Sequence, residues 1–211
     1  MISASNPHFE GVYVIDDFQS YEVDQFPNEW KGRKKKAKKE YTIQMEENNK
    51  YLQAESHNSD MFILKKCNVD ATKFQYLNWK WRVHEIPENG NESVKKQCDT
   101  PATIAVIFRL SKWRPKSLKY TFSSTLPPMT TTKSPYAKWP ARTDILVLRN
   151  KDSGLGNWIS EKQNVLEDYK KIRDVKEFDK LKIEGILIMT DSDNTKSSAR
   201  ADYDDIFFSI E

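Results

Sequence analysis

Apolar and aromatic residues recur along this chain in short runs, and clusters of turn-forming residues separate one run from the next. The clearest pattern lies at 77–84, where apolar and polar residues alternate (Leu77, Trp79, Trp81 and Val83 against Asn78, Lys80, Arg82 and His84). Because successive side chains of a strand point to opposite faces, this alternation predicts a half-buried strand. The rhythm of short strands and turns favours an all-β sandwich over alternating strands and helices.

The same pattern predicts strands at 13–18, 41–46, 51–56, 61–67, 77–83, 102–110, 118–122, 143–149, 183–190 and 203–210. The run at 102–110 is apolar enough for a central strand buried on both faces. The strands at 41–46 and 51–56 form a hairpin around Asn48 and Asn49. We therefore predict one domain over residues 1–211, a two-sheet antiparallel sandwich like a jelly roll, with residues 1–12 as a flexible N-terminal tail.

Two segments depart from the strand pattern. Ser160 and Gln163 form a capping-box signature, and the apolar residues that follow recur at helical spacing, which predicts one short helix near 160–172. A second helical turn is expected at 174–181. The segment between Phe122 and Thr143 holds too many prolines for a central strand and is predicted to be a long loop.

Charge and composition exclude several functions. Lys and Arg number 34 and Asp and Glu 31, so the net charge of +3 is too balanced to indicate a nucleic-acid partner. No apolar run approaches the roughly 20 residues of a membrane span, and the N-terminus lacks the pattern of a signal peptide. The chain has no GxSxG, HExxH or P-loop motif and only three histidines.

A local basic run stands out against this balance (Lys31, Arg33, Lys34, Lys35, Lys36, Lys38 and Lys39). It fits a solvated strand edge whose lysines block pairing with another sheet. It equally fits a clamp for the charged groups of an anionic polymer. Cys67 and Cys98 lack the spacing of a zinc site, and a disulfide between them is left open.

Tryptophans supply candidates for sugar contact, because an aromatic ring packs on the apolar face of a pyranose. Trp79 and Trp81 are assigned to the core by their alternation. Trp113 and Trp139 lie in loops beside prolines, where burial is less obligatory. The candidate ligand-binding residues are Trp113, Trp139, Arg142, Trp158, Glu161, Asp168, Asp191 and Asp193.

Acidic residues crowd the segment 191–205, including Asp191, Asp193, Asp202, Asp204 and Asp205. Hard cations take six to eight oxygen ligands, so Ca²⁺ is one interpretation, and local turn chemistry is the other. We favour turn chemistry and predict no cofactor. The expectation is that backbone amides or basic side chains pair with Asp191 and Asp193, and that alternation sends Asp204 and Asp205 to opposite faces.

Carboxylates also allow an enzymatic interpretation. Glu161 and Asp168, with Asp191 and Asp193, are candidates for the acid and base, or the acid and nucleophile, of a glycosidase. Such a pair requires a short separation and a shared cleft, which spacing in sequence does not reveal.

Two phrases resemble a bacterial family described as a domain of unknown function, number 3047. They are W-x-x-E-x-x-N-V-x-x-D-Y at 158–169 and T-D-x-D-N-T at 190–195, and the resemblance extends upstream to LNWKWRV and VIDDF. It implies a galactose-binding-like jelly roll, an exported protein and, by analogy of fold alone, a carbohydrate ligand. We therefore expect a non-catalytic module for a glycan or anionic surface polymer, located in the periplasm or secreted. The alternative is a carbohydrate-active hydrolase or lyase.

Overall fold

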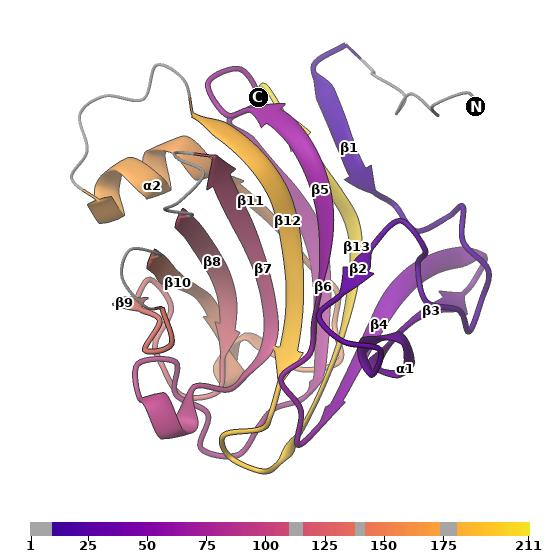
Figure 1. Cartoon of the computed structure of the whole chain (residues 1–211), viewed down its shortest axis with the longest axis vertical. Coiled ribbons are helices and arrows are strands. Elements are labelled where there is room, and N and C mark those ends of the chain that lie inside the picture. Colours follow the sequence, from indigo (N-terminus) through magenta and orange to yellow (C-terminus); the bar gives the residue numbers. More distant parts are fainter. Residues whose placement is uncertain (1–9, 110–115, 138–141, 174–180) are drawn as a thin grey trace.

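The computed structural model describes residues 10–109, 116–137, 142–173 and 181–211, which form a sandwich of two β-sheets (Figure 1). The first sheet has the order β11-β6-β13-β4-β3, with β1 also paired to β13. The second has the order β2-β5-β12-β7-β8-β10-β9. The all-β two-sheet prediction is confirmed.

The six-stranded sheet consists of β1 Val12–Asp16, β3 Tyr41–Glu46, β4 Asn49–His57, β6 Tyr76–Glu85, β11 Ile159–Asn164 and β13 Ser198–Ser209. The seven-stranded sheet consists of β2 Lys31–Gly32, β5 Phe62–Asp70, β7 Thr100–Arg109, β8 Lys116–Ser123, β9 Thr131–Lys133, β10 Arg142–Asn150 and β12 Lys182–Asp191. The helices are α1 Ala37–Glu40 and α2 Val165–Arg173, with 3₁₀ turns at Lys95–Gln97 and Lys151–Ser153.

The core lies between the sheets and is built from the predicted alternation. On β6, Leu77, Trp79, Trp81 and Val83 are all buried. The rings of Trp79 and Tyr120 lie 5.4 Å apart between centroids, which joins β6 of one sheet to β8 of the other. Each buried aromatic side chain removes about 150–250 Å² from water, so these contacts are a large part of the stabilisation.

Two further strand predictions are confirmed with adjustments. β3 and β4 form the expected hairpin, but its two-residue turn is Glu47–Asn48, where φ is 48° and 72°. Positive φ at both positions is typical of the type I′ turn that suits the twist of a hairpin. β7 is the central strand expected at 102–110, with Ile104, Val106 and Phe108 buried in the core.

Other expectations need correction. One pair of strands, β8 and β10, runs parallel, because β9 first turns back and pairs with the far side of β10. The predicted loop between Phe122 and Thr143 therefore contains a short strand.

Both cysteines are free thiols, and burial raises the pKa of Cys67 and of Cys98 to about 12.

The helix predicted near 160–172 begins five residues later. Residues 159–164 form β11, which pairs antiparallel with the edge of β6. The helix then starts at Val165, and the Asn164 side chain accepts a hydrogen bond from the backbone N–H of Glu167 at 2.9 Å. Asn164 is thus the N-cap in place of Ser160, because pairing with an available strand edge outweighs a local capping signal. Most of the second predicted turn lies outside the described residues.

α2 closes one end of the sandwich, where the Tyr169 ring lies 4.5 Å from the ring of Phe108 between centroids. Within the described residues, no helix has the length and apolar character needed to cross a membrane. The predicted tail at 1–12 falls largely outside the description, and Val12 already belongs to β1.

Candidate functional site

A cavity with a volume of ≈ 510 Å³ lies on the outer face of the seven-stranded sheet. Its floor is formed by side chains that alternate with those of the core. Ala105 and Ile107 come from β7, and Leu187 and Met189 from β12. The cavity reaches from β5 across β12, β7 and β8 to β10, so its long direction crosses the strands. A groove of this form suits an elongated ligand.

Polar side chains stand on the same floor. Ser117 and Thr143, from the parallel pair β8 and β10, share a hydrogen bond of 2.8 Å between their hydroxyls. Lys119 points its ammonium at the sulfur of Met189 at 3.7 Å. The floor therefore combines apolar surface with hydroxyl groups and one cation.

An acidic corner forms where β12 ends and β7 begins. One carboxylate oxygen of Asp99, Asp191 and Asp193 each lies within 4.8 Å of the others. Asp191 accepts a hydrogen bond from the backbone N–H of Thr100 at 2.9 Å, so the predicted pairing with a backbone amide is confirmed for this residue. Asp193 accepts from the side-chain amide of Asn194 at 2.9 Å.

Asp99 holds this corner together. Its Oδ1 accepts from the backbone and side-chain N–H groups of Asn194, both at 3.1 Å. Its Oδ2 accepts from the backbone N–H and the hydroxyl of Thr195, both at 2.6 Å. A fully buried carboxylate with four donors fixes the turn that carries Asp193. The residues Asn194 and Thr195 of the sequence T-D-x-D-N-T therefore anchor this turn to Asp99.

Burial sets the protonation of the corner. It raises the pKa of Asp191 well above its usual range, against the attraction of Lys119. Burial also raises the pKa of Asp193, which is partly exposed, and the neighbouring carboxylate of Asp99 adds to this rise. Removing a carboxyl from water disfavours its charged form, so Asp191 favours the neutral acid, which is able to donate a hydrogen bond.

Aromatic and charged residues form the two ends of the cavity. At the β9 end, the Tyr136 hydroxyl donates to the carbonyl oxygen of Lys95 at 2.9 Å and also bonds to the Asn194 side chain. The residue is 51% exposed, its hydroxyl is fixed, and the Lys95 ammonium lies over its ring at 5.6 Å from the centroid. At the β5 end, Arg33 is paired with Asp60 and lies over the ring of Phe62.

The other predicted site residues lie elsewhere. Buried Glu161 accepts from Arg149 at 2.7 Å and 3.3 Å and lines a separate cavity of ≈ 250 Å³. Asp168, on α2, accepts from the Tyr120 hydroxyl at 3.0 Å. Neither carboxylate shares a cavity with Asp191 and Asp193.

Trp158 and Arg142 are not among the described residues that line this cavity. Trp158 lies on the outer face of the six-stranded sheet, where the Arg82 guanidinium is 4.6 Å from its ring centroid and the Tyr51 ring 5.6 Å. Arg142 forms an ion pair with Asp144 at 3.0 Å. Trp113 and Trp139 fall outside the described residues.

The later aspartates of the acidic segment belong to the six-stranded sheet. Asp202 accepts from Arg82 at 2.8 Å and bonds to His84 at 2.6 Å. The register of β13 shifts after Asp204, and Asp205 has a φ of 49°. This bulge interrupts the alternation, so Asp204 bonds to Asn49 and Asp205 to Lys80 on one face. The prediction of opposite faces is wrong, and the segment does not form one ion site.

Sequence reasoning missed Lys119 and Tyr136, which line the cavity, and Asp99, which supports its acidic corner. Lys119 alternates with buried Leu118 and Tyr120, so its outward direction was available from the pattern. Tyr136 lies in the proline-rich segment that was predicted to be a long loop. Asp99 gave no local signal, because its partners follow about 95 residues later in the chain.

The fold and the cavity together define a β-sandwich with a groove across its larger sheet. The chain belongs to the family described as “Protein of unknown function (DUF3047)”, which matches residues 28–207. Among curated proteins, none matches this chain.

Several solved structures are similar in their β-sandwich arrangement. Endoglucanase 3 of Trichoderma harzianum is 6% identical, with 95% of this chain and 97% of that chain covered and a TM-score of 0.45. Endoglucanase Cel12A of Rhodothermus marinus is 10% identical, with 84% and 94% covered and a TM-score of 0.43. TmCBM61, solved with β-1,4-galactotriose, is 12% identical, with 85% and 86% covered and a TM-score of 0.34. Similarity at this level carries no information about function.

Proposed function

We propose that this protein is a non-catalytic glycan-binding domain and that its ligand lies in the cavity across the seven-stranded sheet. The observation that carries the proposal is the pairing of an apolar floor with a fixed corner of carboxyl, amide and hydroxyl groups. A sugar ring has the matching surface, with apolar C–H faces and a rim of hydroxyl groups. A few placed polar groups in a largely apolar cleft are typical of small-ligand sites.

Apolar groups for contact with a sugar ring lie on the floor of the cavity and at its rim. Ala105, Ile107 and Leu187 offer a flat floor between the strands. Tyr136 offers an exposed ring at the rim, and its two hydrogen bonds restrict the movement of that ring. A rigid aromatic side chain supplies contact area with little loss of conformational entropy on binding.

The polar partners match the two hydrogen-bonding roles of a sugar hydroxyl. Asp193 is partly exposed and offers acceptor oxygens, and the side-chain amide of Asn194 holds its carboxylate in place. Burial raises the pKa of Asp191 in the same corner, which favours the protonated form that is able to donate a hydrogen bond. The volume of ≈ 510 Å³ lies within the range of about 300–1,000 Å³ found for ligand sites.

Calorimetric titration with a panel of oligosaccharides tests the proposal. Tyr136→Ala and Asp193→Ala are expected to weaken binding about tenfold each, which corresponds to about 1.4 kcal/mol. Met45→Ala is the matched control, because Met45 is 55% exposed but lies on β3 of the other sheet. The proposal fails if no oligosaccharide binds, or if both cavity variants bind as tightly as the wild type.

Glycoside hydrolysis is a second candidate, favoured by one observation. The carboxylate oxygens of Asp191 and Asp193 lie within 4.8 Å, close to the roughly 5–5.5 Å between the acid and the nucleophile of retaining enzymes. Asp191 would donate a proton to the leaving oxygen, and Asp193 would attack the anomeric carbon. Release of new reducing ends, abolished in Asp191→Asn while binding persists, would establish catalysis. Binding without any release supports the module.

A surface glycan as ligand also implies that the protein acts outside the cytoplasm. Fractionation of source cells, with detection of the chain in periplasmic or secreted material, tests this part of the proposal separately from binding.

A further inference from the structure

We propose, on the footing of the function proposed above, that the glycan is acidic and that its negative groups lie on a basic surface beside the cavity. This basic surface consists of Lys31, Arg33, Lys34, Lys35, Lys36, Lys38 and Lys39, all of them exposed. It is formed by β2, the turn after it and α1. The sequence leaves its purpose open between edge protection and anion binding, and the structure separates the two.

The positive charges of this surface are largely uncompensated. Arg33 pairs with Asp60, and Lys36 pairs with Glu40 at 2.9 Å. Among the described residues, no ion pair is formed by the other lysines of the surface, which are Lys31, Lys34, Lys35, Lys38 and Lys39. Like charges so close in sequence repel one another and destabilise the folded chain unless an anion lies nearby.

Edge protection explains only a small part of this surface. β2 is the edge strand of its sheet, and its paired residues are Lys31 and Gly32 alone. One lysine on a strand this short is enough to discourage pairing with another sheet. The basic residues at 34–39 lie in the turn and in α1, beyond the paired residues of β2.

Arg33 connects the basic surface to the cavity. It lines the cavity with Phe62, and its backbone N–H donates to the carbonyl oxygen of Phe62 at 2.9 Å. The cavity crosses the sheet from β10 to β5, and the next strand in that direction is β2. A chain of sugars lying across the strands would therefore leave the cavity over Arg33 and continue onto the lysines.

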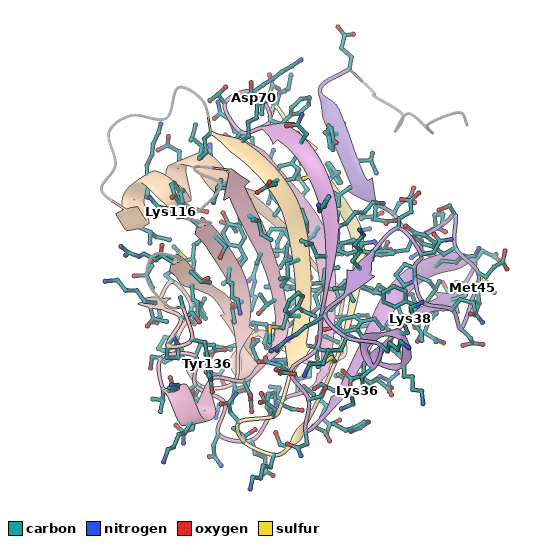
Figure 2. All side chains as sticks on the ribbon, in the orientation of Figure 1. Lys36, Lys38, Met45, Asp70, Lys116 and Tyr136 are labelled. Atoms are coloured by element: carbon teal, nitrogen blue, oxygen red, sulfur yellow. The ribbon has the colours of Figure 1, made fainter. Side chains whose placement is uncertain are left out.

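Figure 2 shows the same arrangement, with Tyr136 at one side of the seven-stranded sheet and Lys36 and Lys38 at the other. The two ends of the site differ in chemistry. Near Tyr136 and the acidic corner the ligand meets aromatic, amide and carboxyl groups, which suit neutral hydroxyls. Beyond Arg33 it meets exposed ammonium groups, which suit carboxylates, sulfates or phosphates on the sugars. An acidic polysaccharide satisfies both ends at once.

The experiment compares a glucuronate-containing oligosaccharide with a neutral one of the same length, by calorimetry at low and high salt. A sulfated oligosaccharide of equal charge distinguishes the anionic group. The variant is Lys34→Gln, Lys35→Gln and Lys39→Gln together. The matched control is Lys151→Gln, Lys171→Gln and Lys182→Gln, which changes the net charge equally at exposed positions on other elements.

At low salt the wild type is expected to bind one of the acidic oligosaccharides about tenfold more tightly than the neutral one. That preference should disappear in the first triple variant and at high salt, and persist in the control variant. If acidic and neutral oligosaccharides bind equally and only Tyr136→Ala weakens both, the acidic ligand is wrong and glycan binding stands. If no oligosaccharide binds, the proposed function itself fails. Equally tight binding of single-stranded DNA of the same charge would overturn the assignment to a glycan.

Discussion

Asp191, the last residue of β12, accepts a hydrogen bond at 2.9 Å from the backbone N–H of Thr100, the first residue of β7. Both residues are buried, and burial raises the pKa of the Asp191 carboxyl well above its usual range. The bond therefore joins the two central strands at the acidic corner of the cavity, where burial disfavours the charged form of the carboxyl. The corner is part of the fold as well as of the candidate site.

This relationship predicts different effects for two substitutions. Asp191→Asn keeps an acceptor for Thr100 and removes the ionisable group, so the free energy of unfolding at pH 8 should equal or exceed that of the wild type. Asp191→Ala leaves a buried N–H without its acceptor and should lower that free energy by about 1–3 kcal/mol. Urea denaturation of the three proteins measures the difference. Equal loss in both variants would contradict the assignment.

Calcium should have no effect on stability. The four donors to Asp99 occupy the oxygens that an ion would need, and Asp202 and Asp204 lie on the other sheet. Melting temperatures in EDTA and in millimolar CaCl₂ are therefore expected to agree. Saturation at about 100 times the dissociation constant would stabilise the protein by about 2.7 kcal/mol, so a bound ion would be visible as an upward shift.

Glu92 predicts a pH dependence. Its side chain is buried beneath the ends of β7 and β8, accepts from the Ser123 hydroxyl at 2.6 Å, and burial raises its pKa from 4.5 to about 7. The folded state then holds a proton that the unfolded state has released. The resulting stabilisation is complete below pH 4.5 and is lost as the pH rises to about 7, a change of about 3 kcal/mol.

Glu92→Gln isolates this effect, because an amide does not titrate. Subtracting the unfolding free energies of the variant from those of the wild type, measured by urea denaturation between pH 4 and 8, removes the contributions of other groups such as Asp204. The difference should fall with rising pH over that window. A difference that stays constant would show that Glu92 ionises at its ordinary pKa.

Substitution of Asp16, in the VIDDF sequence, is expected to cause a large loss of stability. One of its oxygens accepts from the Tyr21 hydroxyl, the Trp30 indole and the Lys65 ammonium, each at 2.8 Å. Asp16→Ala removes the acceptor of two buried donors and one of the two carboxylate partners of the partly buried Lys65, and should lower the free energy of unfolding by about 3–5 kcal/mol. The neighbouring Asp17 is exposed. Asp17→Ala is the control and should change that free energy by less than about 1 kcal/mol, measured by thermal or urea unfolding.

Trp158 should contribute to stability and not to binding in the cavity. Trp158→Ala removes the contacts of its ring with Arg82 and Tyr51 and should lower the free energy of unfolding by about 1–2 kcal/mol. Arg82→Ala should lower it further, since Asp202 is fully buried and loses one of its charged partners. Oligosaccharide affinity should stay at the wild-type value in Trp158→Ala, and weaker binding would move the site to the other sheet.

Much of the fold follows from local pattern alone. The alternation at 77–83 determines a strand with one buried face. Burial of its apolar side chains and hydration of its polar ones are both favourable, whichever strand pairs with it. The hairpin of β3 and β4 is likewise local, since a two-residue turn brings the two strands directly against each other. In these two features, interactions between residues close together in the sequence decide the structure.

Tertiary structure decided what local pattern could not. Residues 159–164 carry a helix-capping signal but form a strand. They pair with the edge of β6, and the availability of that edge for backbone hydrogen bonds is not visible in the local sequence. Asp99 and Asp191 meet only because β7 and β12 are neighbours in the sheet order, although the two residues are far apart in sequence. Residue types and turn chemistry are written along the chain, whereas the proximity of carboxylates from different strands depends on sheet order, which is settled by packing of the whole core.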